Sequence, residues 1–384
     1  MELIEVIYQY SKEIDNPHIF QEIIEHRKET ILGKIGHRYS GNLASIFSTP
    51  EAKELIAKSP CKQLPEQYFI IEQLSQRIFG CLLICWTEFE IFRTIQNSKH
   101  PSDNKKQKQT YPTAQVIDDH YHYEIISDTA LDTRLFHTEF CDQPLLLSDA
   151  IVLINIATFI KEHKWYEMLK ILNISSKGEH FILYQFDDEN DYPNIISSAL
   201  IEPYHQKKNW LFFDDFFQSN KWDNIVNSTY IDQFFPDLAS QKNQPHDYFN
   251  TLSCSELENA MFSSIVDKTR MCGVIRFTVN GPKIKLNYHL YLAQKGLANA
   301  LFLSGRDMIF SIIEQPAMIL FYQEMNNIER EHMPFVFTGS QDINNSGLVT
   351  YKGICLTKNA RYVFNRYNFK EYNVKIIQRR KLLK

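Results

Sequence analysis

The stretch HFILYQFDDENDYPNIISSALIEPYH, from His180 to His205, contains two apolar runs separated by the acidic segment DDEND. Short apolar runs on either side of a cluster of turn residues are typical of a β-hairpin, so two neighbouring strands are predicted here. Beyond this hairpin, helical and strand-like patterns alternate along the chain. The predicted helices are SELENAMFSSIVD, NYHLYLAQKGLANALFLSG and PAMILFYQEMN, and the predicted strands are CGVIRFTVNG, DMIFSIIEQ, PFVFTGSQ and YKGICLT. Residues 147–384 are therefore expected to form an α/β (α+β) domain with a mixed sheet flanked by helices.

The first 146 residues have mostly helical patterns and are expected to form a separate N-terminal region. Apolar residues recur at three- and four-residue spacing in LIEVIYQYSKEI and IFQEIIEHRKETIL. Ser48 or Thr49 can cap a helix that opens at Pro50. The run PEQYFIIEQLSQRIFGCLLICWTEFEIFRTI is apolar nearly all round, which predicts one central helix buried on most faces. The polar, lysine-rich segment 96–113 is the expected linker or exposed loop.

Two further segments lie on either side of the expected boundary between residues 146 and 147. QVIDDHYHYEII alternates and predicts one strand, with His120 and His122 on the same face. Two imidazoles could bind a metal ion, but no third ligand accompanies them, so a solvated strand face is favoured and no metal is expected. The following segment, SDAIVLINIATFIKEHKWYEMLKIL, predicts a helix capped by Ser148 or Asp149.

Composition limits the classes of function. The net charge is -5 and the isoelectric point is about 6.2, so no general basic field is present to bind nucleic acid. Seven scattered cysteines without a CxxC pair are typical of reduced thiols. The N-terminal MELIEVIYQYSKEID has no signal-peptide pattern, and the longest apolar stretches are far shorter than the ~20 residues that span a bilayer. A soluble, cytoplasmic protein with no membrane span is expected.

The segment NWLFFDDFF, after the hairpin, places Asp214 and Asp215 inside a dense aromatic run. Aromatic neighbours would desolvate these carboxylates and raise their pKa, which favours base chemistry. Alternatively, one of them caps a short helix and both are solvated. Glu202 is a further candidate acid because it stands at the end of the second predicted strand, before a proline. Arg276, in VIRFTV, lies on a strand expected to be central, where a buried arginine requires a substrate carboxylate or an internal acid such as Asp214 as its partner.

The order of these elements resembles that of GNAT-type acyltransferases, and within that superfamily the acyl-homoserine-lactone (autoinducer) synthases. The hairpin resembles the LuxI-type segment in which a strand, an acidic turn and a second strand lead into a Leu-Leu-Pro element. NWLFFDDFF is similar to the stretch that follows it, VIRFTV to the family's Arg-Phe-containing strand, and QPAMILFYQEM to its penultimate helix. The large N-terminal half, which LuxI-type enzymes lack, makes the chain similar to the LuxM/AinS branch. Its expected role is to shape the cleft or to form a dimer.

The chain departs from the LuxI-type pattern at three places. A glutamate stands three residues before the strand arginine in that family, whereas this chain has Gly273. An arginine precedes the Leu-Leu-Pro element, whereas Ser198 and Ala199 stand here. The pyrophosphate loop of coenzyme A-dependent GNAT enzymes is missing, because QKGLA at residues 294–298 imitates only its first half and falls inside a predicted helix. This departure is consistent with a donor held partly by a carrier protein.

The resemblance implies a reaction between an acyl thioester and S-adenosylmethionine. The acyl group, carried by acyl carrier protein or coenzyme A, would pass to the amine, and lactonisation would release methylthioadenosine with no cofactor beyond the substrates. A carboxylate suits the base that takes the ammonium proton, and splayed GNAT strands supply backbone N–H donors for the oxyanion. The candidate catalytic residues are Glu202, Asp214 and Asp215, and the candidate substrate-binding residues are Arg276, Trp210, Phe213 and Phe216.

Two other functions remain open from the sequence. One is a different GNAT-type N-acyltransferase that uses acyl-coenzyme A and another amine, and the other is a non-catalytic binding module on a GNAT scaffold. The basic C-terminal tail, KEYNVKIIQRRKLLK, could dock the acidic acyl carrier protein or could simply be solvated. The segment TGSQDINNSGLVTYKG, which contains Asp342, is expected to be a polar loop that joins two strands.

Overall fold

The computed structural model describes residues 3–36, 41–58, 64–98, 109–187, 190–235, 238, 248–343 and 349–383. Parts of three predicted segments lie outside the described residues: 99–108 of the expected linker, 188–189 of the acidic turn and 344–348 of the polar loop near the C-terminus.

Two compact units make up the chain. The first, here called the N-terminal unit, comprises Met1–Thr110, Asp128–Lys177 and Phe186–Ile195, and the second, the sheet unit, comprises Tyr111–Ser127, Gly178–Gln185 and Ile196–Lys384. The sequence leads one to expect a single boundary between residues 146 and 147. The observed division is discontinuous because Tyr111–Ser127 and Gly178–Gln185, which interrupt the N-terminal unit along the chain, pair as strands in the sheet unit.

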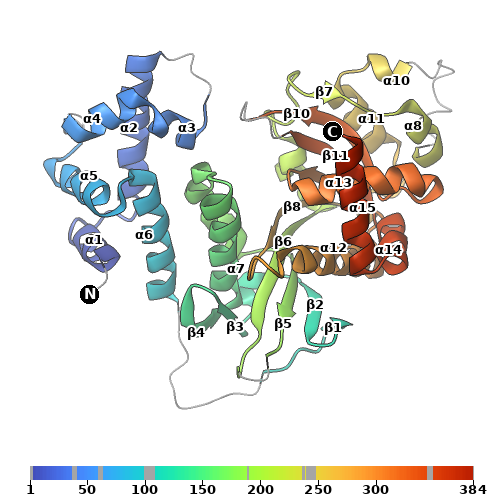
Figure 1. Cartoon of the computed structure of the whole chain (residues 1–384), viewed down its shortest axis with the longest axis horizontal. Coiled ribbons are helices and arrows are strands. Elements are labelled where there is room, and N and C mark those ends of the chain that lie inside the picture. Colours follow the sequence, from blue (N-terminus) through green and yellow to red (C-terminus); the bar gives the residue numbers. More distant parts are fainter. Residues whose placement is uncertain are drawn as a thin grey trace. The chain divides into compact units, whose positions relative to one another are not determined.

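Helices dominate the first part of the N-terminal unit. They are α1 (Leu3–Glu13), α2 (Ile19–Ile35), α3 (Leu43–Ser48), α4 (Pro50–Lys58), α5 (Glu66–Phe79) and α6 (Leu82–Asn97), drawn in blue in Figure 1. The cap expected before Pro50 is Thr49, whose hydroxyl accepts the N–H of Ala52 at 3.2 Å. The single central helix expected here is instead two helices. Gly80 ends α5 in a left-handed conformation with φ of 66°, which glycine adopts without steric cost.

The rest of the N-terminal unit combines a hairpin with a long irregular helical stretch. Strands β3 (Leu135–Thr138) and β4 (Cys141–Leu146) pair antiparallel, and the sequence patterns do not predict them. Helix α7 (Leu147–Asn155) continues as a π-helix over Ile156–Glu162, and a 3-10 helix follows over Tyr166–Ser176. Leu146 occupies the N-cap of α7, so the expected caps, Ser148 and Asp149, lie inside its first turn.

A mixed sheet forms the centre of the second unit, in the order β1-β2-β5-β6-β8-β9-β11-β10-β7. The strands are β1 (Gln115–Asp118), β2 (Tyr121–Ile126), β5 (His180–Gln185), β6 (Asn194–Pro203), β7 (Asp223–Asn224), β8 (Met271–Val279), β9 (Met308–Ile313), β10 (Phe335–Gln341) and β11 (Thr350–Leu356). Strands β5 and β6 are neighbours, which confirms the predicted hairpin. The alternating segment expected as one strand is the hairpin β1–β2, so His120 lies in its turn and only His122 lies on a strand.

Each face of this sheet packs on its own hydrophobic core. Neighbouring strand residues alternate between the two cores, as the pleat of a strand requires: Cys272 belongs to one and Met271 to the other, as do Ile309 and Phe310. The first core includes side chains of α12 (Leu286–Leu303), α13 (Pro316–Ile328), α14 (Thr357–Arg366) and α15 (Phe369–Leu382), the orange and red helices of Figure 1.

The second core, here called the aromatic core, covers the opposite face. Side chains from residues 204–265 build it, including those of α8 (Ser228–Phe234), α10 (Tyr248–Thr251) and α11 (Cys254–Ser264). The fold class expected from the sequence, a helical N-terminal region followed by a mixed sheet with flanking helices, is therefore confirmed.

The C-terminal tail expected from the sequence is the helix α15, which follows the unpredicted helix α14. A capping box between Asn368 and Glu371 starts α15. Its buried side chains, Tyr372 and Ile376, pack into the first core of the sheet unit. Within the ranges that the structure describes, no helix is long and apolar enough to cross a membrane.

Candidate active site

A bulge interrupts the pairing of β6 with β8. Ser198 lies opposite Thr278 but Leu200 lies opposite Ile275, so β8 carries one extra residue between these pairs. Within this bulge Arg276 has φ of 55°, a left-handed conformation that costs a side chain of this kind about 1–2 kcal/mol. Strained backbone of this type persists where the surrounding structure fixes it, often at a functional site.

Strands β8 and β9 stay together over only part of their length. Their parallel pairing runs from Met271 with Met308 to Val274 with Ser311. In these fully described strands no β8–β9 pair lies beyond Ser311, although β8 continues to Val279. Arg276 and the rest of the bulge therefore belong to the part of β8 that has left its parallel neighbour.

Glu202 lies near the end of β6, directly opposite Gly273 on β8. Its residue is 9% exposed, and its Oε2 atom is buried without a hydrogen-bond partner. Burial raises the pKa of the carboxyl to about 7, although the backbone N–H of Leu211 and the charge of Arg276 act in the opposite direction. This carboxyl is therefore able to take up and release a proton near neutral pH.

The glycine opposite Glu202 makes room for this carboxylate. A Cβ atom on residue 273 would lie 2.7 Å from Glu202 Oε2 and 3.4 Å from Trp210 Cδ2. Residue 273 is also the position at which LuxI-type enzymes have a glutamate. In this chain the carboxylate of Glu202, from the neighbouring strand, reaches the space that a side chain at that position would enter.

Arg276 is the cation whose charge acts on the pKa of Glu202. Burial lowers the pKa of its guanidinium to about 10, and the charge of Glu202 raises it. The sequence allows two partners for Arg276, an internal acid or a substrate carboxylate. In the structure Glu202 is an internal acid whose charge acts on Arg276. Asp214, the internal acid named from the sequence, is exposed.

The aromatic run after β6 packs into the aromatic core. Trp210 is 1% exposed, and its Nε1 donates to the carbonyl oxygen of Pro203 at 3.1 Å. Phe213 stacks on Trp210 with ring centroids 6.1 Å apart and contacts Phe262 and Phe310. Phe216 is 42% exposed. The expected aromatic residues thus range from a fully buried ring beside Glu202 to a ring at the surface.

Asp214 and Asp215 are both exposed, so the surrounding aromatic rings do not bury them. Asp214 Oδ1 accepts the N–H of Phe216 at 3.0 Å in a local turn. In this fully described turn no helix begins at either acid, so of the alternative considered from the sequence only the exposure to solvent is found. Asp214 and Asp215 are exposed because only the rings of Trp210 and Phe212 are buried in the core, whereas the turn that follows them lies at the surface.

Glu314 is a second carboxyl of this region, which the sequence patterns do not single out. It follows β9 directly, at the end of the strand where β8 and β9 have separated. Burial raises its pKa to about 7, and its Oε1 accepts the hydroxyl of Thr350 at 2.8 Å. In the sequence it stands between an apolar strand and Gln315, which caps α13, and no pattern distinguishes it from an ordinary strand end.

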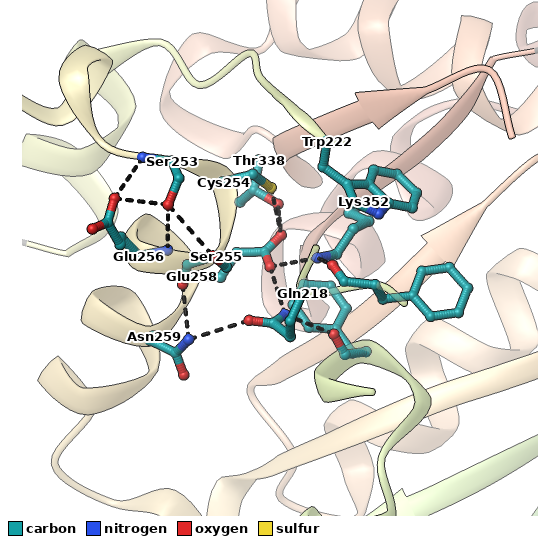
Figure 2. Close-up of polar contacts among 12 residues, drawn as sticks. Gln218, Trp222, Ser253, Cys254, Ser255, Glu256, Glu258, Asn259, Thr338 and Lys352 are labelled. Atoms are coloured by element: carbon teal, nitrogen blue, oxygen red, sulfur yellow. Dashed lines mark hydrogen bonds and ion pairs between the residues drawn. The ribbon is translucent and has the colours of Figure 1, made fainter. Parts of the chain in front are cut away.

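A buried ion pair, also unpredicted, lies under the aromatic run. Lys352 of β11 and Glu258 of α11 are both 0% exposed in their side chains, with Nζ 2.6 Å from Oε2 (Figure 2). Lysine inside an otherwise apolar strand is the signal that the sequence does contain. No group of three or more His, Cys, Asp or Glu side chains suited to a metal ion is found among the described residues.

Comparisons with known proteins agree with this architecture. A family model described as acyl homoserine lactone synthase matches residues 2–384. The acyl-homoserine-lactone synthase LuxM of Vibrio harveyi is 28% identical over 372 residues, which cover 96% of this chain and 90% of that protein. The acyl-homoserine-lactone synthase OpaM of Vibrio parahaemolyticus serotype O3:K6 (strain RIMD 2210633) is 28% identical over 382 residues, 97% of this chain and 91% of that protein. No solved structure matches the chain. Because the family model spans almost every residue, the chain belongs to the acyl-homoserine-lactone synthase family.

Proposed function

We propose that this protein transfers an acyl group from an acyl thioester to the amine of S-adenosylmethionine and closes the product to a lactone. The observation that carries the proposal is Glu202, a buried carboxyl with a pKa of about 7 next to the bulge of β8, in a chain that belongs to a synthase family. The product would serve as a quorum-sensing autoinducer, made in the cytoplasm.

In the first step Glu202 takes a proton from the ammonium of S-adenosylmethionine. The freed amine attacks the thioester carbonyl, and an amide bond forms as the carbon–sulfur bond of the thioester breaks. The leaving thiolate takes the second proton from the nitrogen and departs as the thiol, and Glu202 returns its proton to solvent. A carboxyl with a pKa near 7 suits this task because about half of it is ionised at neutral pH and it is basic enough to accept the proton. The tetrahedral oxyanion would bind backbone N–H groups of β8 beyond Val274, where pairing with β9 has ended.

In the second step the carboxylate of the acylated substrate attacks its own γ-carbon. The carbon–sulfur bond to the sulfonium breaks, its electron pair neutralises the sulfur, and methylthioadenosine leaves as the lactone closes. Arg276 would hold the substrate carboxylate, because guanidinium groups bind carboxylates in bidentate geometry. Its half-buried position at the bulge and its coupling to Glu202 support this role.

The aromatic residues would form the rest of the substrate site. Trp210 and Phe213 lie on the same sheet face as Glu202 and would contact the acyl chain, which gains ~0.8 kcal/mol for each buried methylene. Phe216, at the surface, would contact the nucleoside. Asp214 and Asp215 would attract the positively charged S-adenosylmethionine from solvent, a task for which exposed carboxylates suit.

The acyl donor is proposed to be acyl carrier protein or acyl-coenzyme A, and mass spectrometry of the culture medium tests the whole reaction. A host that makes no lactones, when it expresses this chain, should secrete acyl-homoserine lactones, whereas the same host with the Glu202→Gln variant should secrete far less. An acylated amine of another kind in the medium, without lactones, would favour a different N-acyltransferase and would overturn the proposal.

A further inference from the structure

Every polar atom of the buried pair Lys352–Glu258 is used. Glu258 Oε1 accepts the hydroxyl of Thr338 at 2.6 Å and the thiol of Cys254 at 3.2 Å (Figure 2). Glu258 Oε2 accepts Lys352 Nζ at 2.6 Å and Gln218 Nε2 at 3.1 Å. An ion pair without solvent contact is therefore compensated in full within the sheet unit.

The pair Lys352–Glu258 contacts the aromatic segment Trp210–Trp222 through hydrogen bonds and ring contacts. Lys352 Nζ donates to the carbonyl oxygen of Phe217. The same ammonium lies 4.6 Å from the ring centre of Phe212 and 5.2 Å from that of Trp222. Gln218, which bonds to Glu258, also donates to the carbonyl oxygen of Phe212 at 2.9 Å. Four residues of one segment are thus attached to one buried charge pair.

Such a buried ion pair adds little to the free energy of unfolding, but it can fix the orientation of the chain segment bonded to it. Removing two charges from water costs nearly as much as their attraction returns, and well-packed apolar side chains often replace a buried pair without loss. A cation that bonds a loop carbonyl, in contrast, fixes the direction of the loop backbone. The segment fixed here is the one that carries Trp210 and Phe213 in the core on the sheet face of Glu202, and Phe216 at the surface.

We infer that Lys352 and Glu258 are positioning residues that set the shape of the acyl site by holding the segment Trp210–Trp222. They do not bind substrate directly, since protein groups already occupy the charged atoms of both side chains. The inference rests on the proposed function, because it assigns this segment to the wall of the acyl site. Its consequence is that the pair determines which acyl chain lengths are accepted. Because the segment also carries Phe216, the pair affects the affinity for S-adenosylmethionine as well.

The test is the double variant Lys352→Met/Glu258→Gln, which removes both charges together and leaves no uncompensated ion. kcat/KM is measured with butanoyl and octanoyl thioesters of coenzyme A. The ratio of the two values should shift by about tenfold, the size expected when a hydrophobic wall misplaces a methylene or two. The KM for S-adenosylmethionine should rise as well, because the displaced segment also carries Phe216, the proposed contact of the nucleoside.

The chain offers a matched control in the N-terminal unit. Arg27 of α2 and Glu72 of α5 also form a buried pair, with side chains 2% and 1% exposed. The double variant Arg27→Met/Glu72→Gln should keep the parental selectivity ratio, because that pair is not attached to the aromatic segment. An equal shift in both double variants would mean that loss of any buried pair alters selectivity, and would overturn the inference.

If the double variant Lys352→Met/Glu258→Gln does not fold, the single variant Gln218→Ala tests the same positioning role. Gln218→Ala leaves the ion pair intact but removes the side-chain hydrogen bonds of Gln218 with Phe212, Glu258 and Asn259. The selectivity ratio should therefore shift in the same direction by a smaller factor. A parental ratio in a folded, active Lys352→Met/Glu258→Gln or Gln218→Ala protein contradicts the inference. Failure of the proposed function is distinct, because the parent protein itself would then release no methylthioadenosine.

Discussion

At the scale of single residues, the chemistry of this protein depends on where each carboxyl group lies relative to water. Glu202 and Glu314 have pKa values raised to about 7 by burial, whereas Asp214 and Asp215 lie at the surface. All four are acids close to apolar sequence. Their surroundings are set by strand register and by the direction of one turn, which are properties of the folded chain.

The pH dependence of the rate tests Glu202 as the base. A base must be deprotonated, so kcat/KM should rise with pH through about 7 and level off above it. Glu202→Gln should lower the plateau by roughly 10²–10⁴-fold and remove the rising limb. Glu314→Gln is the matched control, because its carboxyl has a similar pKa, and it should keep the limb. A Glu202→Gln enzyme with the parental pH profile would exclude this role.

Gly273 offers a way to move the Glu202 carboxylate without changing it. In Gly273→Ala the new Cβ would lie 2.7 Å from Oε2, the end of a flexible side chain, and 3.3 Å from Glu202 Cβ. The strand should therefore adjust by a few tenths of an ångström, and the carboxylate should move aside. Displacement of this size is expected to lower kcat about 10²-fold. Thermal unfolding should change little, so the expected pattern is a lowered kcat together with a parental unfolding temperature.

The control for this variant is Gly33→Ala in α2, where no atom lies within 4 Å of the added Cβ. It should keep full activity and gain about 0.5–1 kcal/mol in the free energy of unfolding, because alanine favours the helix. If Gly273→Ala has normal kcat, the carboxylate does not act from its observed position.

At the scale of elements, the bulge of β8 and its separation from β9 create the region to which the proposed chemistry belongs. The sequence could predict that VIRFTV is a strand, that a hairpin precedes it and that QKGLA lies inside a helix, all of which the structure has. It could not predict the bulge, because Arg276 adopts a positive φ that no residue type signals except glycine or asparagine. Nor could apolar periodicity locate the break at Gly80 or the turn between β1 and β2.

Two substitutions at Arg276 separate its backbone role from its side-chain role. Both Arg276→Gly and Arg276→Ala remove the guanidinium, so both should raise the KM for S-adenosylmethionine by about tenfold or more. Glycine adopts φ of 55° without strain, so the Gly variant should unfold with a free energy about 1 kcal/mol above that of the Ala variant. Urea titration measures this difference. Equal stabilities would show that the bulge is not strained, and a normal KM would show that Arg276 does not bind substrate.

At the scale of the whole molecule, two compact units share one chain that passes between them more than once. Local patterns predict the helical character of the first part and the mixed sheet of the second, because these follow from nearby residues. The division between units depends on which strands pair over long sequence distances, and β2 with β5 is such a pair. Sequence periodicity carries no information on pairing partners, so the discontinuous boundary could not be predicted.

The basic helix α15 gives a prediction about the acyl donor at this scale. Arg380 and Lys381 are exposed at its end, and an acidic carrier protein would associate faster with such a surface. Arg380→Glu/Lys381→Glu should lower kcat/KM for acyl carrier protein thioesters about tenfold at low salt and leave acyl-coenzyme A unaffected. Lys53→Glu/Lys177→Glu, with the same change in net charge in the N-terminal unit, should behave as the parent. Equal effects of the two variants would place the docking surface elsewhere.

The most direct test of the central claim is the stoichiometry of the purified protein with S-adenosylmethionine and an acyl thioester. Methylthioadenosine and acyl-homoserine lactone, both measured by mass spectrometry, should appear in equal amounts, with one free thiol for each lactone. Both products should fall together in Glu202→Gln. Thiol release without methylthioadenosine, or no turnover with either coenzyme A or carrier-protein thioesters, would contradict the account.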